Sequence, residues 1–484
     1  MSSIIPRCST LVFDIGDVLF SWSPVNTTTI SPRTLKSMLR SPAWFEYECG
    51  RISEDECYRL IGETFSLDAS EVRQSFADAR KSLTPDNLFL GFIRQLQEES
   101  GGHLRIFAMS NISAPDYEYV REQPADWSIF QRVFTSAAAG MRKPSLGFFR
   151  HVLEQIAADP STVVFVDDRP ENIISARSLG INGIVFDNPA KVRQALRYFV
   201  GDPTHRGRAF LEARAGQLET ETTSGDPVEE NFTQLLILEA TGDKNLVRYV
   251  EHPRTWNFFR GKPQLTTDNY PADLDTTSVG LMVTKPDDLA FNSVMDEIVR
   301  GKDADGIPQV YFDKTRPRID PVVCVNALSL FYSRGRGSEL PDALAWVEGT
   351  LQHRAYLDGT LYYHTAESFL FFISRLLQSS DDKALHTRLA PLLKERLAER
   401  IGASGSALAL AMRIIACASV GVRDELDLRG LLQLQLEDGG WEASGIYRYP
   451  TSGVTVGNRG LTTAFALNAI AAVEGAQPYM RPRV

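Results

Sequence analysis

The chain has 484 residues and a formal net charge of −10, from 51 Lys+Arg against 61 Asp+Glu. Its 43% hydrophobic and 10% aromatic residues are ordinary globular proportions, which exclude collagen-like, disordered and disulfide-stapled proteins. At roughly 100–200 residues per domain the length predicts about two to four domains, and the mildly acidic balance argues against a nucleic-acid partner, because phosphate neutralisation needs a clustered basic surface.

The first two hundred residues alternate short apolar runs with helical periodicity. Runs that are apolar on both faces are typical of central parallel strands, and they occur at 10–13, 104–109, 163–166 and 183–186. Helical patterns such as 144–157 and 172–179 lie between them. We therefore predict a doubly wound, Rossmannoid α/β domain over residues 1–205, with its chemistry at the carboxyl ends of the strands. Residues from about 25 to 97 show no strand signal and predict a helical cap over that edge.

Composition changes near residue 215. The stretch 217–227 is polar and poor in apolar residues, which is typical of a linker, and we assign 206–230 to it. Almost every segment of 231–484 is helical in pattern, at 278–300, 321–333, 365–377, 382–401, 405–420 and 461–473. Helices of similar length without a strict sequence repeat predict a stacked or toroidal all-α domain. The predicted fold class is thus multidomain, α/β followed by all-α.

Neither a secretory leader nor a membrane span is predicted from the sequence. The cysteines are scattered without a CxxC pair, which suits a reducing compartment: Cys8, Cys49, Cys57, Cys324 and Cys417. The apolar stretch 403–422 is interrupted by Arg413 and predicts a buried core helix, since a span needs about 20 predominantly apolar residues. We expect a cytoplasmic protein without stable membrane insertion.

Four short polar motifs follow the predicted strands of the first domain. They are Asp14-Ile15-Gly16-Asp17, Ser110-Asn111, Lys143-Pro144 and Asp167-Asp168-Arg169-Pro170-Glu171. Carboxylates, a hydroxyl and an ammonium that converge on one sheet edge suit phosphoryl transfer. We expect Asp14 to attack phosphorus, Ser110 and Lys143 to neutralise the developing charge, and Asp167 and Asp168 to hold Mg²⁺.

These motifs, in this order and spacing, resemble the haloacid dehalogenase superfamily over residues 8–200. The resemblance adds Asn111 to the phosphate-binding set and Asp14 and Gly16 to the metal site. Phosphatases of that superfamily usually carry a second Asp, a general acid and base, where this chain has Gly16. Asp17 is a doubtful substitute, because a residue shifted by one along a strand points to the other face. Two interpretations stay open, an active phosphatase served by another acid and a retained scaffold with little turnover.

In the helical half, the most specific motif is Asp273-Leu274-Asp275-Thr276-Thr277, just before a predicted helix. Two carboxylates two residues apart can lie close together, so that one ionised neighbour helps to hold the other as a protonated acid. A neutral carboxylic acid beside an apolar pocket is what protonation of an alkene requires. The alternative is a purely structural role, in which Asp and Thr cap the helix.

The motif DxDTT resembles the acid motif of class II terpene cyclases, and residues 435–441, QLEDGGW, resemble the QxxDGGW element of their toroidal β-type domains. Joined to a haloacid dehalogenase-like domain, this arrangement resembles sesquiterpene cyclases that make drimane skeletons, of the drimenol and albicanol type. That group also carries a DDxxE motif, matched here by 167–171. No DDxxD motif occurs in the helical half, so departure of diphosphate is not expected to start the cyclisation.

The resemblance implies a bifunctional enzyme with farnesyl diphosphate as substrate and Mg²⁺ as cofactor. Asp275 would protonate the terminal double bond, while Asp273 and Thr276 tune or orient it, and Asp14 would then hydrolyse the bicyclic diphosphate. Aromatic candidates for stabilising the cation are Phe258, Phe259, Tyr311, Tyr362 and Trp441, although Trp441 suits a structural role better. Candidate cations for the diphosphate are Arg260, Lys262, Lys314, Arg316, Arg318, Arg448 and Arg459, and Glu171 is a further candidate site residue.

Two rival functions stay open at this point. One is a monofunctional class II cyclase that releases the bicyclic diphosphate while its amino-terminal domain is inert. The other is a phosphatase whose helical half is only an interaction scaffold. The sequence leaves open the chain length of the isoprenoid, the position of the product alkene and the oligomeric state.

Overall fold

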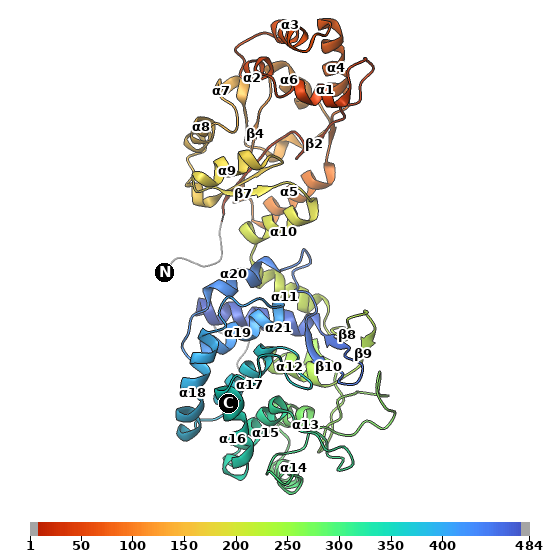
Figure 1. The fold of residues 1–484 in the computed structure, drawn as a ribbon, viewed down its shortest axis with the longest axis vertical. Coiled ribbons are helices and arrows are strands. Elements are labelled where there is room, and N and C mark those ends of the chain that lie inside the picture. Colours follow the sequence, from red (N-terminus) through yellow and green to blue (C-terminus); the bar gives the residue numbers. More distant parts are fainter. Residues whose placement is uncertain (1–7, 476–484) are drawn as a thin grey trace. The chain divides into compact units, whose positions relative to one another are not determined.

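The computed structural model describes residues 8–475, which form two compact units on either side of the Asp202–Pro203 bond (Figure 1). Unit 1, before this bond, is an α/β domain, and unit 2, after it, has mostly helices as its regular structure. The predicted fold class, α/β followed by all-α, is confirmed.

Unit 1 is built on a five-stranded sheet in the order β5-β4-β1-β6-β7, with every neighbouring pair parallel. Its strands are β1 (Thr10–Phe13), β4 (Arg105–Ser110), β5 (Arg132–Thr135), β6 (Val163–Asp167) and β7 (Asn182–Val185). The register pairs Phe13 with Ala108 on one side and with Val166 on the other. Residues just beyond these three positions therefore meet at one edge. Strand β5 was not predicted, because its four residues include the exposed Arg132.

Helices cover both faces of this sheet (Figure 1). Helix α5 (Asn87–Glu99) packs its apolar side with α10 (Pro189–Val200) over one face, and α8 (Leu146–Ile156) and α9 (Pro170–Ser178) pack over the other. The short helices α6 (Ala114–Arg121) and α7 (Ser136–Ala139) complete the unit.

The cap is shorter than the predicted range of about 25–97. It comprises α1 (Pro32–Met38), α2 (Pro42–Glu48), α3 (Glu54–Phe65) and α4 (Ala69–Lys81), which share their own apolar core. The chain enters and leaves the cap through the paired strands β2 (Phe20–Ser21) and β3 (Thr84–Pro85). Helix α5 belongs to the sheet domain instead, because Phe89 and Ile93 pack against the strands.

Unit 2 contains a closed ring of inner helices, in which each helix contacts the next and the last contacts the first. The ring consists of α12 (Phe232–Thr241), α13 (Leu274–Thr284), α15 (Pro321–Ser333), α17 (Ala366–Gln378), α19 (Ala407–Ser419) and α21 (Arg459–Glu474). Most residues of these helices are buried, as expected of helices that pack against neighbours on several sides. Outside lie α11 (Pro203–Ala213), α14 (Asp288–Arg300), α16 (Pro341–Gln352), α18 (Lys383–Ala398) and α20 (Glu425–Gln433). The predicted toroid is confirmed.

One predicted helix is in fact two. The range 278–300 was expected to be continuous, but α13 ends at Thr284, its cap residue Lys285 has a left-handed φ of 50°, and the Asp287 side chain caps α14. Pro286 lies between them and cannot donate the backbone hydrogen bond that a continuous helix needs.

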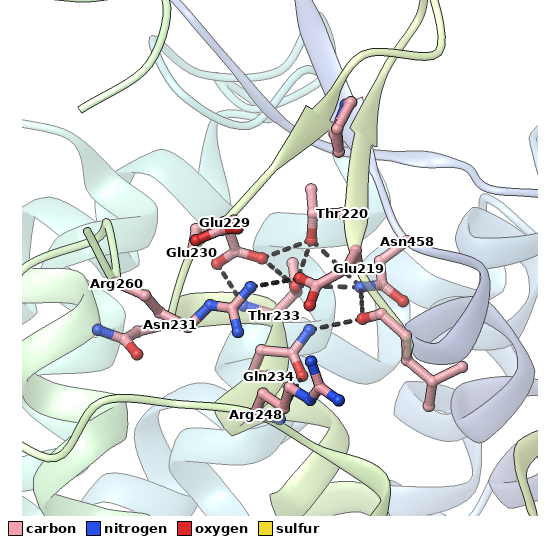
Figure 2. A network of polar contacts seen from close by, with 12 residues as sticks. Glu219, Thr220, Glu229, Glu230, Asn231, Thr233, Gln234, Arg248, Arg260 and Asn458 are labelled. Atoms are coloured by element: carbon pink, nitrogen blue, oxygen red, sulfur yellow. Dashed lines mark hydrogen bonds and ion pairs between the residues drawn. The ribbon is translucent and has the colours of Figure 1, made fainter. Parts of the chain in front are cut away.

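The predicted linker 206–230 is wrong, because this segment is part of unit 2. It contains most of α11 and the strands β8 (Thr220–Thr222) and β9 (Pro227–Val228), which join β10 (Gly445–Arg448) and β11 (Thr455–Gly457) in a four-stranded sheet. A network of buried polar groups holds the segment in place (Figure 2). Thr220 Oγ1 donates to Glu230 Oε1 at 2.5 Å, and Asn458 Nδ2 donates to Leu218 O at 2.9 Å. Hydrogen bonds thus replace the apolar contacts that the composition lacks.

Among residues 8–475, no helix combines the length and the apolar character needed to cross a membrane.

Candidate active sites

The polar edge of the unit 1 sheet brings together the residues predicted for phosphoryl transfer. Asp14 follows β1, Ser110 ends β4 and Asp167 ends β6. Lys143 Nζ lies 2.9 Å from Asp14 Oδ1 and 2.7 Å from Asp167 Oδ2. The ammonium therefore bridges the proposed nucleophile and a proposed metal ligand.

Burial and charge oppose each other in this cluster. Burial raises the pKa of Asp14, while Lys143 opposes that rise and favours the nucleophilic carboxylate. Burial by itself would lower the pKa of Lys143, but Asp14 and Asp167 outweigh it and the pKa is raised. Lys143 is therefore held as a cation in the interior, where it can neutralise charge on a phosphoryl group.

The carboxylates fit a hard metal ion. Ligand oxygens of Asp14, Asp167 and Asp168 lie within 4.8 Å of one another, and such all-oxygen sets suit Mg²⁺. Burial and the charges of Asp167 and Asp17 raise the pKa of Asp168 to about 6. The three carboxylates would repel one another less with a divalent cation bound between them.

Two amides support the cluster. Asn111 Oδ1 accepts from the Lys143 backbone N at 2.7 Å, and Asn111 Nδ2 donates to the Lys143 carbonyl at 2.9 Å. Asn111 thus positions Lys143 through its backbone. Asn172, which was not predicted, donates to Asp167 Oδ1 at 2.9 Å. The only feature of the sequence that could have indicated this role is that Asn172 directly follows the DDxxE motif.

Three neighbouring positions differ in their relation to the cluster. Glu171 is half-exposed and paired with Arg169 at 2.8 Å, outside the carboxylate set. Asp17 has a left-handed φ of 55° and accepts from Trp22 Nε1 at 3.2 Å. A Cβ on Gly16 would meet nothing within 4 Å, so this position has room for a side chain that the chain lacks.

In unit 2 the motif 273–277 lies at a narrow, closely packed cavity of about 10 Å³. Asp273 caps α13 by accepting from Thr276 N at 2.7 Å, and Asp275 lies in the first turn of the helix. The carboxyls of both aspartates line the cavity beside aromatic rings, and Thr276 lies next to them. The capping role and the proposed acid role therefore coexist in one motif.

The carboxyl groups of Asp273 and Asp275 both have a pKa near neutral pH. Burial raises the pKa of Asp273 to about 7, although the backbone N–H of Thr276 opposes the rise. Burial also raises the pKa of Asp275 to about 7, against the hydrogen bonds from Tyr363 and Asn326. A large fraction of either group is therefore protonated near neutral pH, as an acid catalyst requires. Asp273 Oδ2 and Thr276 Oγ1 are buried without a hydrogen-bond partner.

Asp275 is held by residues that sequence reasoning missed. Asn326 Nδ2 donates to Asp275 Oδ1 at 2.5 Å, and the Tyr363 hydroxyl donates to Oδ2. Asn326 Oδ1 accepts from Arg375 Nη1 at 3.1 Å, and Arg375 Nη2 pairs with Glu239 at 2.7 Å. The available signal was a polar residue within an otherwise apolar helix, which applies to Asn326 in α15 and to Arg375 in α17.

The predicted aromatic residues occupy different places. Phe258 and Tyr362 line the cavity, together with Phe232, Tyr270 and Tyr447, which were not predicted. Tyr311 lies behind them, with its hydroxyl 2.9 Å from that of Tyr362, and Phe259 packs against Phe258. Trp441 lies elsewhere, fully buried, with Nε1 donating to Leu431 O at 2.7 Å.

The QxxDGGW element closes the toroid rather than forming the cavity. Gln435 Nε2 donates to Pro203 O at 2.9 Å, so it ties α11 to the carboxy-terminal part of unit 2. Asp438 pairs with Arg459 at 2.9 Å at the start of α21. Gly439 has a φ of 91°, and a Cβ there would lie 2.4 Å from Arg206 O, so only glycine fits.

The predicted diphosphate-binding cations are dispersed. Arg260 is mostly buried and paired with Glu219 at 2.5 Å (Figure 2), while Lys262 is exposed and 3.5 Å from Asp268. Arg448 donates to Thr360 O at 2.8 Å, and Arg316 donates to Thr267 Oγ1 at 3.0 Å. Lys314 and Arg318, in contrast, line a cleft next to the cavity.

Comparisons with known proteins agree with both halves of this description. Drimenol cyclase drtB of Aspergillus calidoustus is 47% identical over 95% of this chain and 87% of its own length. Sesquiterpene phosphatase astK of Aspergillus oryzae is 36% identical over 39% of this chain and 95% of its own. A family profile described as the sesquiterpene cyclase astC-like C-terminal domain matches residues 204–334.

Among solved structures, a predicted haloacid dehalogenase-like hydrolase from Porphyromonas gingivalis is 21% identical. The match covers 38% of this chain and 92% of that one, with a TM-score of 0.29. The identity to drimenol cyclase extends over nearly the whole length of both proteins. The chain therefore belongs to the drimane-type sesquiterpene cyclases in which a haloacid dehalogenase-like domain is fused to a class II terpene cyclase domain.

Proposed function

We propose that this enzyme cyclises farnesyl diphosphate to a drimane-type bicyclic diphosphate in unit 2 and removes the phosphates in unit 1 to give the alcohol. The observation that carries the proposal is the buried pair Asp273 and Asp275 at an aromatic cavity, on a chain whose other unit gathers Asp14, Asp167 and Lys143. The similarity to a drimenol cyclase supports the cyclisation stage. The similarity to a sesquiterpene phosphatase supports the dephosphorylation stage.

Cyclisation begins when protonated Asp275 donates its proton to the terminal double bond. The carboxylate left behind is stabilised by the hydrogen bonds of Asn326 and Tyr363. Two ring closures, each an attack of a double bond on the cation, move the positive charge to a tertiary carbon of the bicycle. Aromatic rings that line the cavity, among them Phe232 and Phe258, stabilise this charge through their quadrupoles. Loss of a proton then gives an alkene of the drimenol or albicanol type, with the diphosphate still attached.

Dephosphorylation uses Asp14 as nucleophile. A bond forms between the Asp14 carboxylate and the terminal phosphorus while the bond to the leaving oxygen breaks, and water then hydrolyses the aspartyl-phosphate. A second round removes the remaining phosphate and frees the alcohol. Lys143 and Ser110 neutralise and orient the phosphoryl oxygens, and Asn111 keeps Lys143 in place.

Asp14, Asp167 and Asp168 would hold Mg²⁺, together with the predicted backbone ligand Gly16. Bound there, the ion supplies positive charge to the phosphoryl oxygens. We place the enzyme in the cytoplasm, since its five cysteines are buried thiols, which a reducing compartment maintains.

Two variants of the full chain test the order of the stages. With farnesyl diphosphate and Mg²⁺, the unaltered chain should release free bicyclic alcohol without added phosphatase. Asp14→Asn should stop at the bicyclic diphosphate, which an added phosphatase converts into the alcohol, and Asp275→Asn should form no bicycle. Full alcohol production by Asp14→Asn would contradict the aspartyl-phosphate.

A monofunctional cyclase is the second candidate, and Gly16 favours it, because the usual general acid is missing from unit 1. In that case the unaltered chain itself stops at the bicyclic diphosphate, and Asp14→Asn changes nothing. Product extraction before and after phosphatase treatment separates the two candidates.

A further inference from the structure

Unit 2 contains a second hollow beside the aromatic cavity, with a volume of about 430 Å³. We define it as the basic cleft, by the four cations that line it: Arg300, Lys302, Lys314 and Arg318. We infer that the basic cleft binds the diphosphate of the substrate while its hydrocarbon chain reacts in the cavity. This inference rests on the proposed function. It gives a binding site to the diphosphate, the part of the substrate that the cavity cannot hold.

The cavity itself has no positive charge. Its lining consists of aromatic and aliphatic side chains together with Asp273, Asp275 and Thr276. A diphosphate that stays attached throughout cyclisation would lose its hydration there without compensation, and beside two carboxyls. The diphosphate must therefore lie outside the cavity, within the length of one hydrocarbon chain from Asp275.

The basic cleft and the cavity share a wall. The Leu274 backbone N donates to Val310 O at 2.8 Å, and the Val310 N donates to Arg318 O at 2.8 Å. The segment at Val310 is thus hydrogen-bonded on one side to the acid motif and on the other to the segment at Arg318, which lines the cleft. Val310 faces the cavity, and its neighbour Gln309 lines the cleft, as the alternation of side chains along an extended segment requires.

A second connection passes through Arg318. Its Nη1 lies 3.4 Å from the hydroxyl of Tyr362, which lines the cavity. Lys302 Nζ donates to the Glu339 carbonyl at 3.3 Å and Arg300 Nε to the Asp296 carbonyl at 3.2 Å, but within residues 8–475 none of the four cations forms an ion pair with a carboxylate. Lys314 is exposed in the same loop. The cations of the basic cleft are therefore available to an anion, unlike Arg260 and Arg459, which are already paired.

Two carboxylates also line the basic cleft, but their own loops engage them. Asp303 Oδ1 accepts from Ile307 N at 2.9 Å, and Asp313 Oδ1 accepts from Thr315 N at 2.9 Å. Four cations face these two carboxylates, so the cleft is net positive. Phosphate oxygens spread over two groups suit several separate ammonium and guanidinium donors better than a single one.

The test uses the full chain with Asp14→Asn, so that bicyclic diphosphate accumulates and is not hydrolysed. In this background the double variant Lys302→Gln/Lys314→Gln should raise KM for farnesyl diphosphate about tenfold or more, with kcat within about twofold, because it removes binding common to substrate and transition state. Arg318 is left intact, since it also contacts Tyr362. Lys394→Gln, which changes an exposed cation on α18 outside the cleft, is the matched control and should leave KM unchanged.

Inorganic diphosphate gives a second readout. It should inhibit bicycle formation competitively, and its inhibition constant should rise in the double variant in parallel with KM. An unchanged KM and inhibition constant would overturn the inference, as would a fall in kcat alone or equal competition by inorganic phosphate. If the Asp14→Asn chain forms no bicycle at all, the proposed function fails instead. Calorimetric titration with inorganic diphosphate then still tests the basic cleft, which is overturned if the double variant binds as the Asp14→Asn chain does.

Discussion

The Nδ2 atom of Asn326 lies 2.5 Å from Oδ1 of Asp275, while Oδ1 of the same amide accepts from Arg375 at 3.1 Å. Because Arg375 can only donate, Asn326 must turn its NH₂ group toward Asp275. Asp275 thus receives one hydrogen bond from Asn326 and another from Tyr363. Both bonds favour the carboxylate, which makes Asp275 a stronger acid than burial alone would allow.

Removing one of these bonds should slow cyclisation. Tyr363→Phe deletes the hydroxyl that donates to Asp275, so the carboxylate formed by proton transfer loses a charge-assisted hydrogen bond of about 1.5–3 kcal/mol. We expect bicycle formation to fall about 10- to 100-fold, measured by product extraction after phosphatase treatment. The matched control is Tyr356→Phe, whose buried hydroxyl has no partner. Equal rates in the two variants would contradict the role of Tyr363.

Bicycle formation should depend on pH through Asp275. Its pKa is raised to about 7, and only the protonated form donates to an alkene, so the rate should fall as the pH rises through 7. Asp273 has a pKa of about 7 as well, so the midpoint belongs to the pair. Tyr363→Phe removes a bond that lowers the pKa, so its profile should move to higher pH. The rate is measured in Asp14→Asn, and a flat profile between about pH 6 and 9 would contradict the assignment.

The sequence predicted the first site more completely than the second. In unit 1, Asp14 directly follows an apolar strand and Ser110 and Asp167 end theirs, so parallel register alone brings these three residues to one edge. In unit 2, Asp275 could be located by its motif, but its partners lie 51 and 88 residues away. Their proximity depends on closure of the helical ring, which no local pattern encodes.

The predictions for the segment 206–230 and for Arg260 failed because the sequence pattern does not show which polar groups the fold pairs. The segment 206–230 is poor in apolar residues, yet Thr220 is fully buried because its hydroxyl forms hydrogen bonds with Glu230, Thr233 and Asn458. The composition of a segment indicates which residues apolar contacts will bury. It does not indicate which polar residues hydrogen bonds will bury. In the same way, Arg260 looked like an available cation until the fold placed Glu219 beside it.

Whether unit 1 is slowed by the lack of the usual general acid can be tested by introducing an aspartate at Gly16. A Cβ at Gly16 meets nothing within 4 Å, and the residue lies outside the left-handed region, so Gly16→Asp should fold. If proton delivery to the leaving group limits the reaction, this variant should hydrolyse an alkyl phosphate about tenfold faster or more. Hydrolysis of p-nitrophenyl phosphate should change little, because that leaving group departs without a proton. An alkyl phosphate rate equal to that of the unaltered chain would show that another residue already supplies the acid.

The buried carboxyl of Glu230 makes the segment before α12 sensitive to a single methyl-for-hydroxyl exchange. Thr233 donates to Glu230 through both its hydroxyl and its backbone N, the latter at 2.9 Å. Thr233→Val keeps the shape but removes the hydroxyl, leaving a buried carboxyl oxygen with fewer donors at a cost of about 1–3 kcal/mol.

Because burial raises the pKa of Glu230, the folded state holds its proton to higher pH than the unfolded state. The stability of this region therefore falls as the pH rises above the ordinary Glu pKa, and the loss in Thr233→Val should grow in the same direction. Hydrogen exchange of peptides covering β8 and α12 measures both effects in the full chain. The control is Thr223→Val, which changes an exposed threonine just after β8. Indistinguishable exchange in the two variants would mean that the polar network does not hold this segment in place.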